Sequence, residues 1–342
     1  MEPEVSVIVP CRNEEKFIDR CLGSVLCSDL PPGALEIIAV DGMSQDSTPA
    51  LLRRWAEINP NVKILFNPRR IAPIGLNLGI RAARGKWLLF LSAHSEYPKG
   101  YVSLCLEAAR RTGADNVGGW LRTLPGDSSL QARLVQAATT HRFGVGNARF
   151  RVNAQEGPAD TVAYGCYRRE VFDRIGLFDE RLVRNSDYEL NRRLASRGGR
   201  IWLDPNIRID YFNQETLAGL MKQAFANGTW NIWMWLMAPH TFAVRHAVPF
   251  LFVTVLIGLA GIGIYSSKAF SLLFAFLGAY AVCALGASYQ QARGLGWWMM
   301  PVLPFLFFAY HVAYGAGTLW GILKHFANKS PVRKKTPIMD PA

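Results

Sequence analysis

Short apolar runs and amphipathic stretches alternate along the first third of the chain. The apolar runs predict strands at Val5–Val9, Leu35–Val40, Val62–Phe66 and Trp87–Leu91. The amphipathic stretches predict helices at Glu14–Cys27, Thr48–Ile58, Pro73–Arg84 and Tyr101–Thr112. Strands that alternate with helices favour an α/β domain with a parallel, Rossmann-like sheet. From about Pro125 to Ala159 the pattern is irregular, which predicts loops that close over a substrate.

Acidic and polar residues follow the first two predicted strands. The segment VSVIVPCRNEEKFIDRCLGSVLCSDLPPGALEIIAVDG places these residues directly after each apolar run. Open α/β sheets bind ligands at the carboxyl ends of their strands. A nucleotide needs backbone groups on the first loop and a carboxylate at the end of the second strand. The chain is therefore expected to begin with a nucleotide site.

The last part of the chain contains three uncharged apolar segments, Pro249–Tyr265, Ala269–Tyr289 and Trp297–Leu323. Each is near or above the roughly 17 to 25 residues that a membrane-spanning helix needs. Aromatic residues, which favour the headgroup zone, lie near their ends. Three such segments in succession predict an α-helical membrane region. Buried core helices are the alternative.

Much of the net charge of +12 lies beside these apolar segments. The basic residues are Lys222, Arg245 and His246 before them, and Lys324, Lys329, Arg333, Lys334 and Lys335 after them. Basic residues that flank membrane spans attract anionic lipids and usually mark the cytoplasmic face. We therefore expect membrane lipids as partners and no nucleic acid.

The charge pattern conflicts with three full membrane crossings. The N-terminus has neither the basic region nor the long apolar run of a signal peptide, so the first domain is expected to stay in the cytoplasm. Three crossings would then place the basic tail outside. One segment can instead be re-entrant or interfacial, and either the third, with Pro301 and Pro304, or the shorter first segment fits that description.

The six cysteines show no CxxC pair and no metal-ligand spacing. They are typical of reduced thiols in a cytosolic domain. The cysteine pattern thus predicts neither a disulfide framework nor a structural zinc site.

Several motifs together carry a family resemblance. They are VIVPCRNEE, AVDGMSQDST, NPRRIAPIGLNLGIRAARGKWLLFLSAHSEYP, FGVGNARFR, GCYRREVFDRIGLFDERLVRNSDYELNRRLASRGGRIWLDP and KQAFANGTW. In this order, over Glu4–Trp230, the chain resembles family 2 glycosyltransferases, and within them the succinoglycan-type exopolysaccharide branch. The resemblance implies a GT-A fold and a nucleotide-sugar donor. It divides the chain into a catalytic domain (1–230), a juxtamembrane segment (231–246), transmembrane helices (247–323) and a basic tail (324–342).

The resemblance places Pro10, Arg12, Glu14 and Asp41 in the nucleotide pocket. The alternative for Asp41 is a turn carboxylate that caps the next helix, for which Ser47 is a natural N-cap. Arg12 and Glu14 can equally be solvent-exposed charges in a first helical turn.

The resemblance makes Asp187, in NSDYEL, the base that deprotonates the acceptor hydroxyl. A carboxylate suits this role because it can take the proton during a single inverting displacement. The alternative is a charge that only favours the helix dipole, with Asn185 or Ser186 as the cap. Ser186 stands where the family usually has glutamate.

The family commonly has Asp-x-Asp or Asp-Ala-His at the end of the fourth strand, where it coordinates a divalent cation. This chain has Ser92, Ala93 and His94 there. Loss of the first carboxylate should weaken Mg²⁺ or Mn²⁺ binding, because hard cations prefer anionic oxygens. His94, with Glu96, remains as the candidate metal ligand.

Gln223 and Trp230 fall where related membrane enzymes carry an acceptor-binding Gln-rich motif that ends in Trp. Trp230 can stack on a sugar or anchor the chain at the membrane interface. The expected function is an inverting transfer of a hexose, from a UDP-sugar, to a polyprenyl-diphosphate-linked oligosaccharide at the inner membrane, beside other polysaccharide-assembly proteins. The alternative is a catalytically degenerate homologue that binds nucleotide-sugar or acts as a scaffold.

Overall fold

The computed structural model describes residues 2–152, 154–327 and 329. The chain forms two compact units, one of residues 1–122 and 149–212 and the other of residues 123–148 and 213–342. Arg333, Lys334 and Lys335 of the predicted basic tail lie outside the described residues. The domain limits given above stay predictions.

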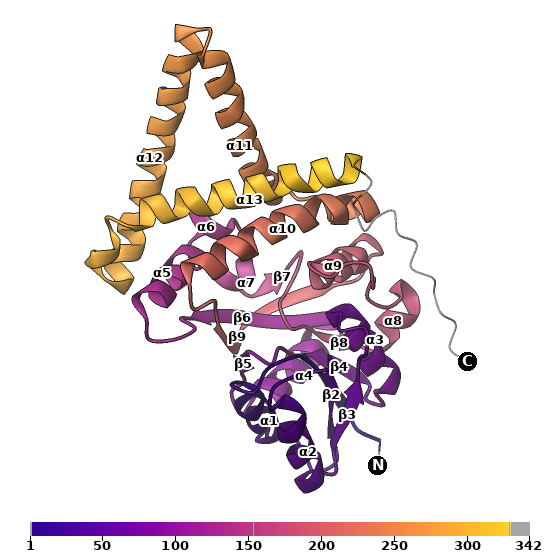
Figure 1. The fold of residues 1–342 in the computed structure, drawn as a ribbon. Helices are drawn as coiled ribbons and strands as arrows, with labels where there is room; N and C mark the ends of the chain where they lie inside the picture. The colour runs from indigo at the N-terminus through magenta and orange to yellow at the C-terminus, as the bar shows by residue number, and fades with distance from the viewer. Residues whose placement is uncertain (1, 153, 328, 330–342) are drawn as a thin grey trace. The chain divides into compact units, whose positions relative to one another are not determined.

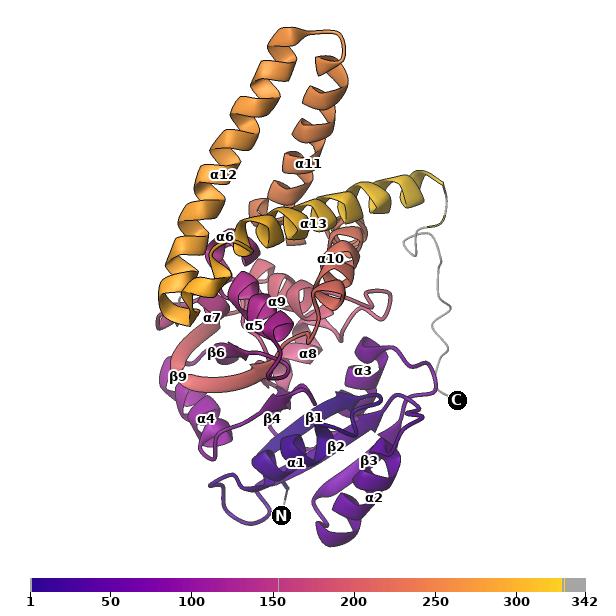
Figure 2. The same ribbon diagram turned by 60° about the vertical axis from the view of Figure 1, so that its left-hand side comes forward.

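The first unit is an α/β structure (Figures 1 and 2). Its first half contains β1 (Val5–Cys11), α1 (Ile18–Leu26), β2 (Leu35–Asp41), α2 (Thr48–Ile58), β3 (Val62–Phe66), α3 (Ala72–Ala82), β4 (Trp87–Phe90), β5 (Ser95–Glu96), α4 (Tyr101–Thr112) and β6 (Asn116–Leu124). Its second half contains α7 (Arg149–Val152), β7 (Gly157–Pro158), β8 (Cys166–Arg168), α8 (Glu170–Ile175), α9 (Ser186–Ser196) and β9 (Ile201–Phe212).

The strands join in the order β3-β2-β1-β4-β8-β6-β9-β5, with β7 on β9. Strands β1 to β4 are parallel, as predicted, and the register places Cys11 beside Asp41 at the carboxyl ends of β1 and β2. The sheet as a whole is mixed, because β8 pairs antiparallel with both β4 and β6. An antiparallel pair has its own hydrogen-bond pattern and does not require a crossover connection between its strands.

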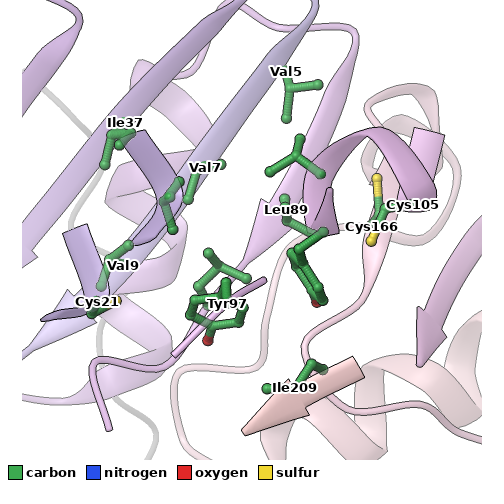
Figure 3. Close-up of a cluster of buried hydrophobic side chains, with 14 of the residues drawn as sticks. Val5, Val7, Val9, Cys21, Ile37, Leu89, Tyr97, Cys105, Cys166 and Ile209 are labelled. Carbon is green, nitrogen blue, oxygen red and sulfur yellow. The ribbon is translucent and has the colours of Figure 1, made fainter. Parts of the chain in front are cut away.

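Buried side chains from both faces of β1 hold the sheet to its helices. Val5, Val7 and Val9 lie in the cluster drawn in Figure 3, and Ile8 lies in a second cluster on the other face. This is the two-residue periodicity of a strand covered on both sides. Figure 3 also places Cys21, Cys105 and Cys166 in the first cluster. All six cysteines are free, and burial raises the pKa of Cys21 to about 12.

Two predicted segments differ from the structure. Helix α1 begins at Ile18 rather than at Glu14, because the backbone of residues 13–15 bonds to the loop after β2 instead. The predicted loop region near 125–159 contains a ten-residue helix, α5 (Leu130–Thr139). Ser129 caps α5 by accepting a hydrogen bond from the amide of Ala132, a start signal that the irregular composition concealed.

The second unit is helical. It contains α5, α6 (Arg142–Val145), α10 (Leu217–Met237), η1 (Pro239–Thr241), α11 (Val244–Gly263), α12 (Ser267–Leu295), η2 (Trp297–Met299) and α13 (Leu303–Phe326). Figures 1 and 2 show α11 and α12 as a hairpin, with α13 lying across its base and beside α10. By length and composition, α11, α12 and α13 could each cross a membrane, in agreement with the three predicted apolar segments.

Candidate functional site

The loops after β1 and β2 are hydrogen-bonded to each other. The amide of Asn13, which has a left-handed φ of 58°, donates to Ser44 Oγ at 2.8 Å, and the amide of Gln45 donates to Asn13 Oδ1 at 2.9 Å. The amide of Glu14 donates to Thr48 Oγ1 at 2.7 Å. Asn tolerates the left-handed region, so the sequence RNEE can form this turn without a glycine. The pair of loops is therefore a fixed platform at the carboxyl ends of β1 and β2.

Asp41 ends β2 on this platform and is only 1% exposed. Its carboxylate accepts hydrogen bonds from Ser44 Oγ at 2.5 Å and from the Ser44 amide at 3.2 Å. Asp46, rather than Asp41 or Ser47, accepts from the first amide of α2, that of Thr48, at 3.0 Å. Two oxygens of a carboxylate offer about four acceptor positions, so Asp41 retains capacity for a ligand hydroxyl or amide.

Pro10 and Arg12 flank the same end of the sheet. Pro10 is half-buried in β1, and Arg12 is exposed just beyond it. A Cβ on Gly42 would lie 3.2 Å from the Arg12 Cβ, so the loop needs a small residue there to let the two chains approach. The structure thus brings together the four residues expected to line a nucleotide pocket, and Glu14 precedes α1 rather than lying in its first turn.

Glu14 and His94 form a polar pair in the first unit. The Glu14 side chain is largely buried, and its Oε1 lies 2.9 Å from His94 Nε2, while the His94 side chain is 47% exposed. The His94 ring also packs edge-on against Phe17. Glu96, the other expected ligand, forms an ion pair with Arg20 at 3.8 Å instead. The carboxylate beside His94 is therefore Glu14.

The Ser92 hydroxyl belongs to a turn. It accepts a hydrogen bond from the His94 amide at 3.2 Å, and the Tyr164 hydroxyl also interacts with it. The Tyr97 hydroxyl bridges the amide and carbonyl of Ser92 at 2.9 and 3.1 Å. Position 92 is thus a rigid point next to His94, where the family commonly has a carboxylate.

The side chains around His94 decide whether a divalent cation could bind there. Among the described residues, no three or more His, Cys, Asp or Glu side chains are grouped as a metal site. Glu14 Oε2, however, is buried without a hydrogen-bond partner in the described part of the chain. A buried anionic oxygen beside an imidazole fits a cation that takes its remaining ligands from phosphates, as Mg²⁺ commonly does.

Asp187 is the second residue of α9. Asn185, in the left-handed conformation with φ 61°, occupies the N-cap position without a side-chain cap bond. The Asp187 side chain is exposed to solvent. Desolvation raises the pKa of its carboxyl group, although its hydrogen bonds with the backbone and the charge of Arg151 oppose that rise. A raised pKa makes an accessible carboxylate a better proton acceptor.

Glu189, two residues further on, has a different role. It is 4% exposed and forms two hydrogen bonds with the Arg193 guanidinium, at 2.9 and 2.6 Å. Arg193 also donates to the carbonyls of Ile175 and Leu177. This buried pair joins α9 to the end of α8, so the accessible carboxylate of the segment is that of Asp187.

Asn191 fixes the orientation of α9. Its buried Oδ1 accepts from Asn116 Nδ2 at 2.7 Å and from the Tyr167 hydroxyl at 2.8 Å, and its Nδ2 donates to Thr161 Oγ1 at 2.9 Å. These partners come from β6, from β8 and from the segment before β8. A buried amide that makes hydrogen bonds to three elements holds them in one arrangement, and Asp187 is carried on the same helix.

Arg151 was not predicted as a site residue. It lies in α7, with its guanidinium 5.3 Å from the Tyr211 ring centroid, and its charge acts on both Asp187 and Tyr164. The sequence signal was its position at the end of FGVGNARFR. Two other arginines contact protein groups instead. Arg168 stacks over Trp87, and Arg169 donates to the carbonyl of Gly85.

Gln223 and Trp230 belong to the second unit. Both lie on α10 and are partly buried, and Trp230 packs edge-on against Trp233 with ring centroids 4.8 Å apart. An acceptor role for these two residues stays a prediction.

A Rossmann-like half-sheet with a polar platform at the carboxyl ends of β1 and β2, combined with antiparallel strands in the same sheet, matches the GT-A fold. The glycosyl transferase family 2 model matches residues 6–176, and the chain belongs to this family. The predicted family and fold are therefore confirmed.

Relatives and a solved structure extend over nearly the whole chain. Succinoglycan biosynthesis protein ExoA of Rhizobium meliloti (strain 1021) is 29% identical and covers 94% of this chain and 96% of that protein. A second relative, from Methanococcus voltae, is a dolichyl N-acetyl-alpha-D-glucosaminyl phosphate 3-beta-D-2,3-diacetamido-2,3-dideoxy-beta-D-glucuronosyltransferase. It is 24% identical and covers 94% of this chain and 97% of that protein. The mannosyltransferase PcManGT from Pyrobaculum calidifontis, in complex with GDP-Man and Mn²⁺, has a TM-score of 0.61 at 20% identity, covering 94% and 88%.

Proposed function

We propose that this glycosyltransferase moves a hexose from a nucleotide-sugar to a lipid-linked oligosaccharide in exopolysaccharide biosynthesis. The proposed donor is a UDP-sugar. The names of the relatives support a glycan product, since one acts in succinoglycan biosynthesis and another transfers a sugar to a dolichyl-phosphate-linked acceptor. The observation that carries the proposal is the exposed Asp187 carboxylate at the start of α9, next to a Glu189 that Arg193 binds.

Asp187 acts as the general base. The acceptor hydroxyl oxygen forms a bond to the anomeric carbon while the bond from that carbon to the donor diphosphate breaks. The hydroxyl proton passes to Asp187, and the nucleoside diphosphate leaves with the bonding electrons. Because the attack comes from the face opposite the leaving group, the single displacement inverts the anomeric configuration.

The platform after β1 and β2 holds the nucleotide. Asp41 accepts hydrogen bonds from the base or ribose with the capacity that Ser44 leaves free. Pro10, Arg12 and Glu14 border the same pocket, and the exposed Arg12 guanidinium is suited to phosphate oxygens. Arg151 places a positive charge near Asp187.

His94 and Glu14 would hold a Mg²⁺ or Mn²⁺ ion together with the donor diphosphate. The presence of Mn²⁺ beside GDP-Man in PcManGT supports this choice. When bound, the ion offsets negative charge on the departing diphosphate.

Residues of the second unit bind the acceptor and attach the enzyme to the membrane. Gln223 and Trp230 bind the acceptor sugar, and the apolar helices keep the enzyme at the bilayer that carries a polyprenyl-diphosphate-linked acceptor. The catalytic domain, residues 1–230, lies on the cytoplasmic face of the inner membrane, in the company of other polysaccharide-assembly proteins.

The test uses the full-length protein in detergent or nanodiscs. UDP-glucose, UDP-galactose and GDP-mannose are each incubated with lipid-linked oligosaccharide from a producing strain, with and without Mn²⁺, and both donor hydrolysis and lipid-linked product are measured. Product whose new linkage has the anomeric configuration opposite to that of the donor is expected. Donor binding without turnover under all conditions would contradict the proposal, and Asp187→Asn serves as the inactive control.

A further inference from the structure

We infer that the chain crosses the bilayer only twice, through the α11–α12 hairpin, and that α13 lies along the membrane surface on the side of α10. Helix α13 then contacts the headgroup region of the bilayer and does not cross its hydrocarbon core. This topology rests on the cytoplasmic placement of residues 1–230 proposed above, and not on the sugar or the activity.

The three apolar helices differ in how much protein covers them. Within the most apolar 18-residue stretch of each helix, 39% of α13 is buried, against 6% of α11 and 11% of α12. Phe307 of α13 is fully buried against Phe143. Such coverage leaves α13 only one open side, whereas the hairpin exposes apolar side chains around most of its surface.

Helix α13 is tied to α10 along its second half. Thr229 Oγ1 donates to the carbonyl of Gly317 at 2.9 Å, and Trp233 Nε1 donates to that of Gly321 at 3.3 Å. A Cβ on Gly228 would lie 2.0 Å from the Tyr314 carbonyl oxygen, so the two backbones are in close contact. An α13 that crossed the bilayer would therefore draw α10 in with it.

Helix α10 is poorly suited to that position. It carries the exposed Lys222 along with Gln223 and the buried Asn231, and it begins only a few residues after β9. A charged side chain at the bilayer centre is strongly unfavourable. The pair of helices is better accommodated at the interface, with α10 and α13 in the same layer.

Polar bonds mark the level of the membrane surface at the base of α12. Gln290 Oε1 lies 2.9 Å from His141 Nε2, and Gln291 Nε2 donates to Thr140 Oγ1 at 2.9 Å. Arg133 donates to the carbonyl of Leu295 at 3.2 Å and stacks over Trp298. Partly exposed donors and acceptors of this kind, with tryptophans beside them, are typical of the interface and not of the hydrocarbon core.

The length of α11 and the exposed side chains of α13 agree with a membrane surface at the base of the hairpin. At 1.5 Å per residue, the 20 residues of α11 span about 30 Å, the thickness of a bilayer core. The apolar residues that α13 exposes are Phe305, Phe308, Trp320, Leu323 and Phe326. A surface helix inserts such side chains into the boundary between headgroups and acyl chains.

Charge distribution separates two crossings from three. With two crossings, Lys268 stands alone at the far end of the hairpin, and Arg245, Arg293, Lys324 and Lys329 all remain on the near side. With three, the last two and the rest of the basic tail would lie on the far side. Only two crossings satisfy the positive-inside rule with the N-terminal domain in the cytoplasm.

Cysteine accessibility in spheroplasts tests the inference. The exposed Cys27 and Cys283 are replaced by serine, single cysteines are introduced as Ser266→Cys at the hairpin tip and Ala327→Cys after α13, and a membrane-impermeant maleimide is added before or after permeabilisation. We expect Ser266→Cys to react in intact spheroplasts. Labelling of Ala327→Cys should rise several-fold on permeabilisation.

A variant that retains only Cys27 is the matched control for the near side, because Cys27 belongs to the first unit. Reaction of Ala327→Cys in intact spheroplasts would establish a third crossing and overturn the inference. Protection of Ser266→Cys until permeabilisation, or protection throughout, would make the hairpin re-entrant and overturn it as well.

Discussion

The end of β2 and the start of α9 each present an aspartate, and their surroundings differ. Asp41 is 1% exposed and receives two hydrogen bonds from Ser44 within its own turn. Asp187 is accessible to solvent, and desolvation raises its pKa. A carboxylate held by its own turn is preorganised to bind, whereas one with a raised pKa is suited to accept a proton.

Glu36 near the start of β2 gives a third environment. Burial alone would raise its pKa, but hydrogen bonds from Ser6, from the Arg84 amide and from Lys63 lower it to about 2. Hydrogen bonds therefore outweigh desolvation at Glu36, whereas desolvation outweighs them at Asp187.

The largest effect is expected at the base. Asp187→Asn should lower the transfer rate at least on the order of a hundredfold, with donor binding nearly intact. In the wild type, kcat/KM should fall as the pH falls through the raised pKa of Asp187, because the protonated carboxyl group cannot accept a proton. Transfer assays across pH, with Ser186→Ala as the neighbouring control, check both; near-normal transfer by the variant would remove Asp187 from the mechanism.

Asn191→Ala tests whether α9 must be held in place. It removes the Asn191 partner of both Asn116 and Tyr167, so the free energy of unfolding should fall by about 2 kcal/mol. Because Asp187 lies on the same helix, kcat should fall while KM for the donor changes little. Thr161→Val, which removes one bond of the network, should have a smaller effect on both quantities; equal effects of the two variants would contradict the anchoring role.

Glu36→Gln should reduce stability at neutral pH and not at low pH. The folded-state pKa of Glu36 is lowered, so its stabilisation is present above about pH 4.5 and is lost as the pH falls towards 2. Lys63 and Arg84 are about half exposed, which limits the loss to about 1 to 2 kcal/mol. Denaturant unfolding in detergent at pH 6 and pH 3 measures it, with Glu96→Gln as an exposed control; a pH-independent loss would refute the assignment.

Asp41→Asn should weaken nucleotide binding by about tenfold, the effect of losing one charged hydrogen bond worth about 1.4 kcal/mol. The transfer rate at saturating donor should change little. Ser44→Ala removes only the local bond and should weaken binding less. Calorimetric titration with UDP and GDP gives the affinities. If Asp41→Asn binds both as well as the wild type does, Asp41 is a turn residue only.

Ser92→Asp should have the smallest effect, a severalfold tightening of Mn²⁺ binding in the presence of nucleoside diphosphate. It restores an anionic oxygen next to His94, which hard cations prefer. Titration of activity with Mn²⁺ after chelator treatment measures it, and Ser95→Asp is a nearby control. Unchanged metal affinity, together with wild-type activity that chelator abolishes, would show that position 92 does not ligate the ion.

The sequence by itself determined the family, the parallel half of the sheet and the three apolar helices. Continuous apolar runs such as Val5–Val9 and Leu35–Val40 can be satisfied only by burial on both faces. Motif spacing then placed Asp41 and Asp187 at the ends of elements, where site residues occur. These features are local in sequence, so a linear pattern is sufficient to identify them.

Only the tertiary structure decided which neighbours surround each group. Glu14 rather than Glu96 lies beside His94, and Glu189 is bound by Arg193 while Asp187 reaches solvent. Helix α13 has the composition of a membrane span, yet α10 covers much of it. Partners that are far apart in the sequence set burial, pKa and coverage, because these quantities depend on the atoms packed around a side chain and not on the order of residues along the chain.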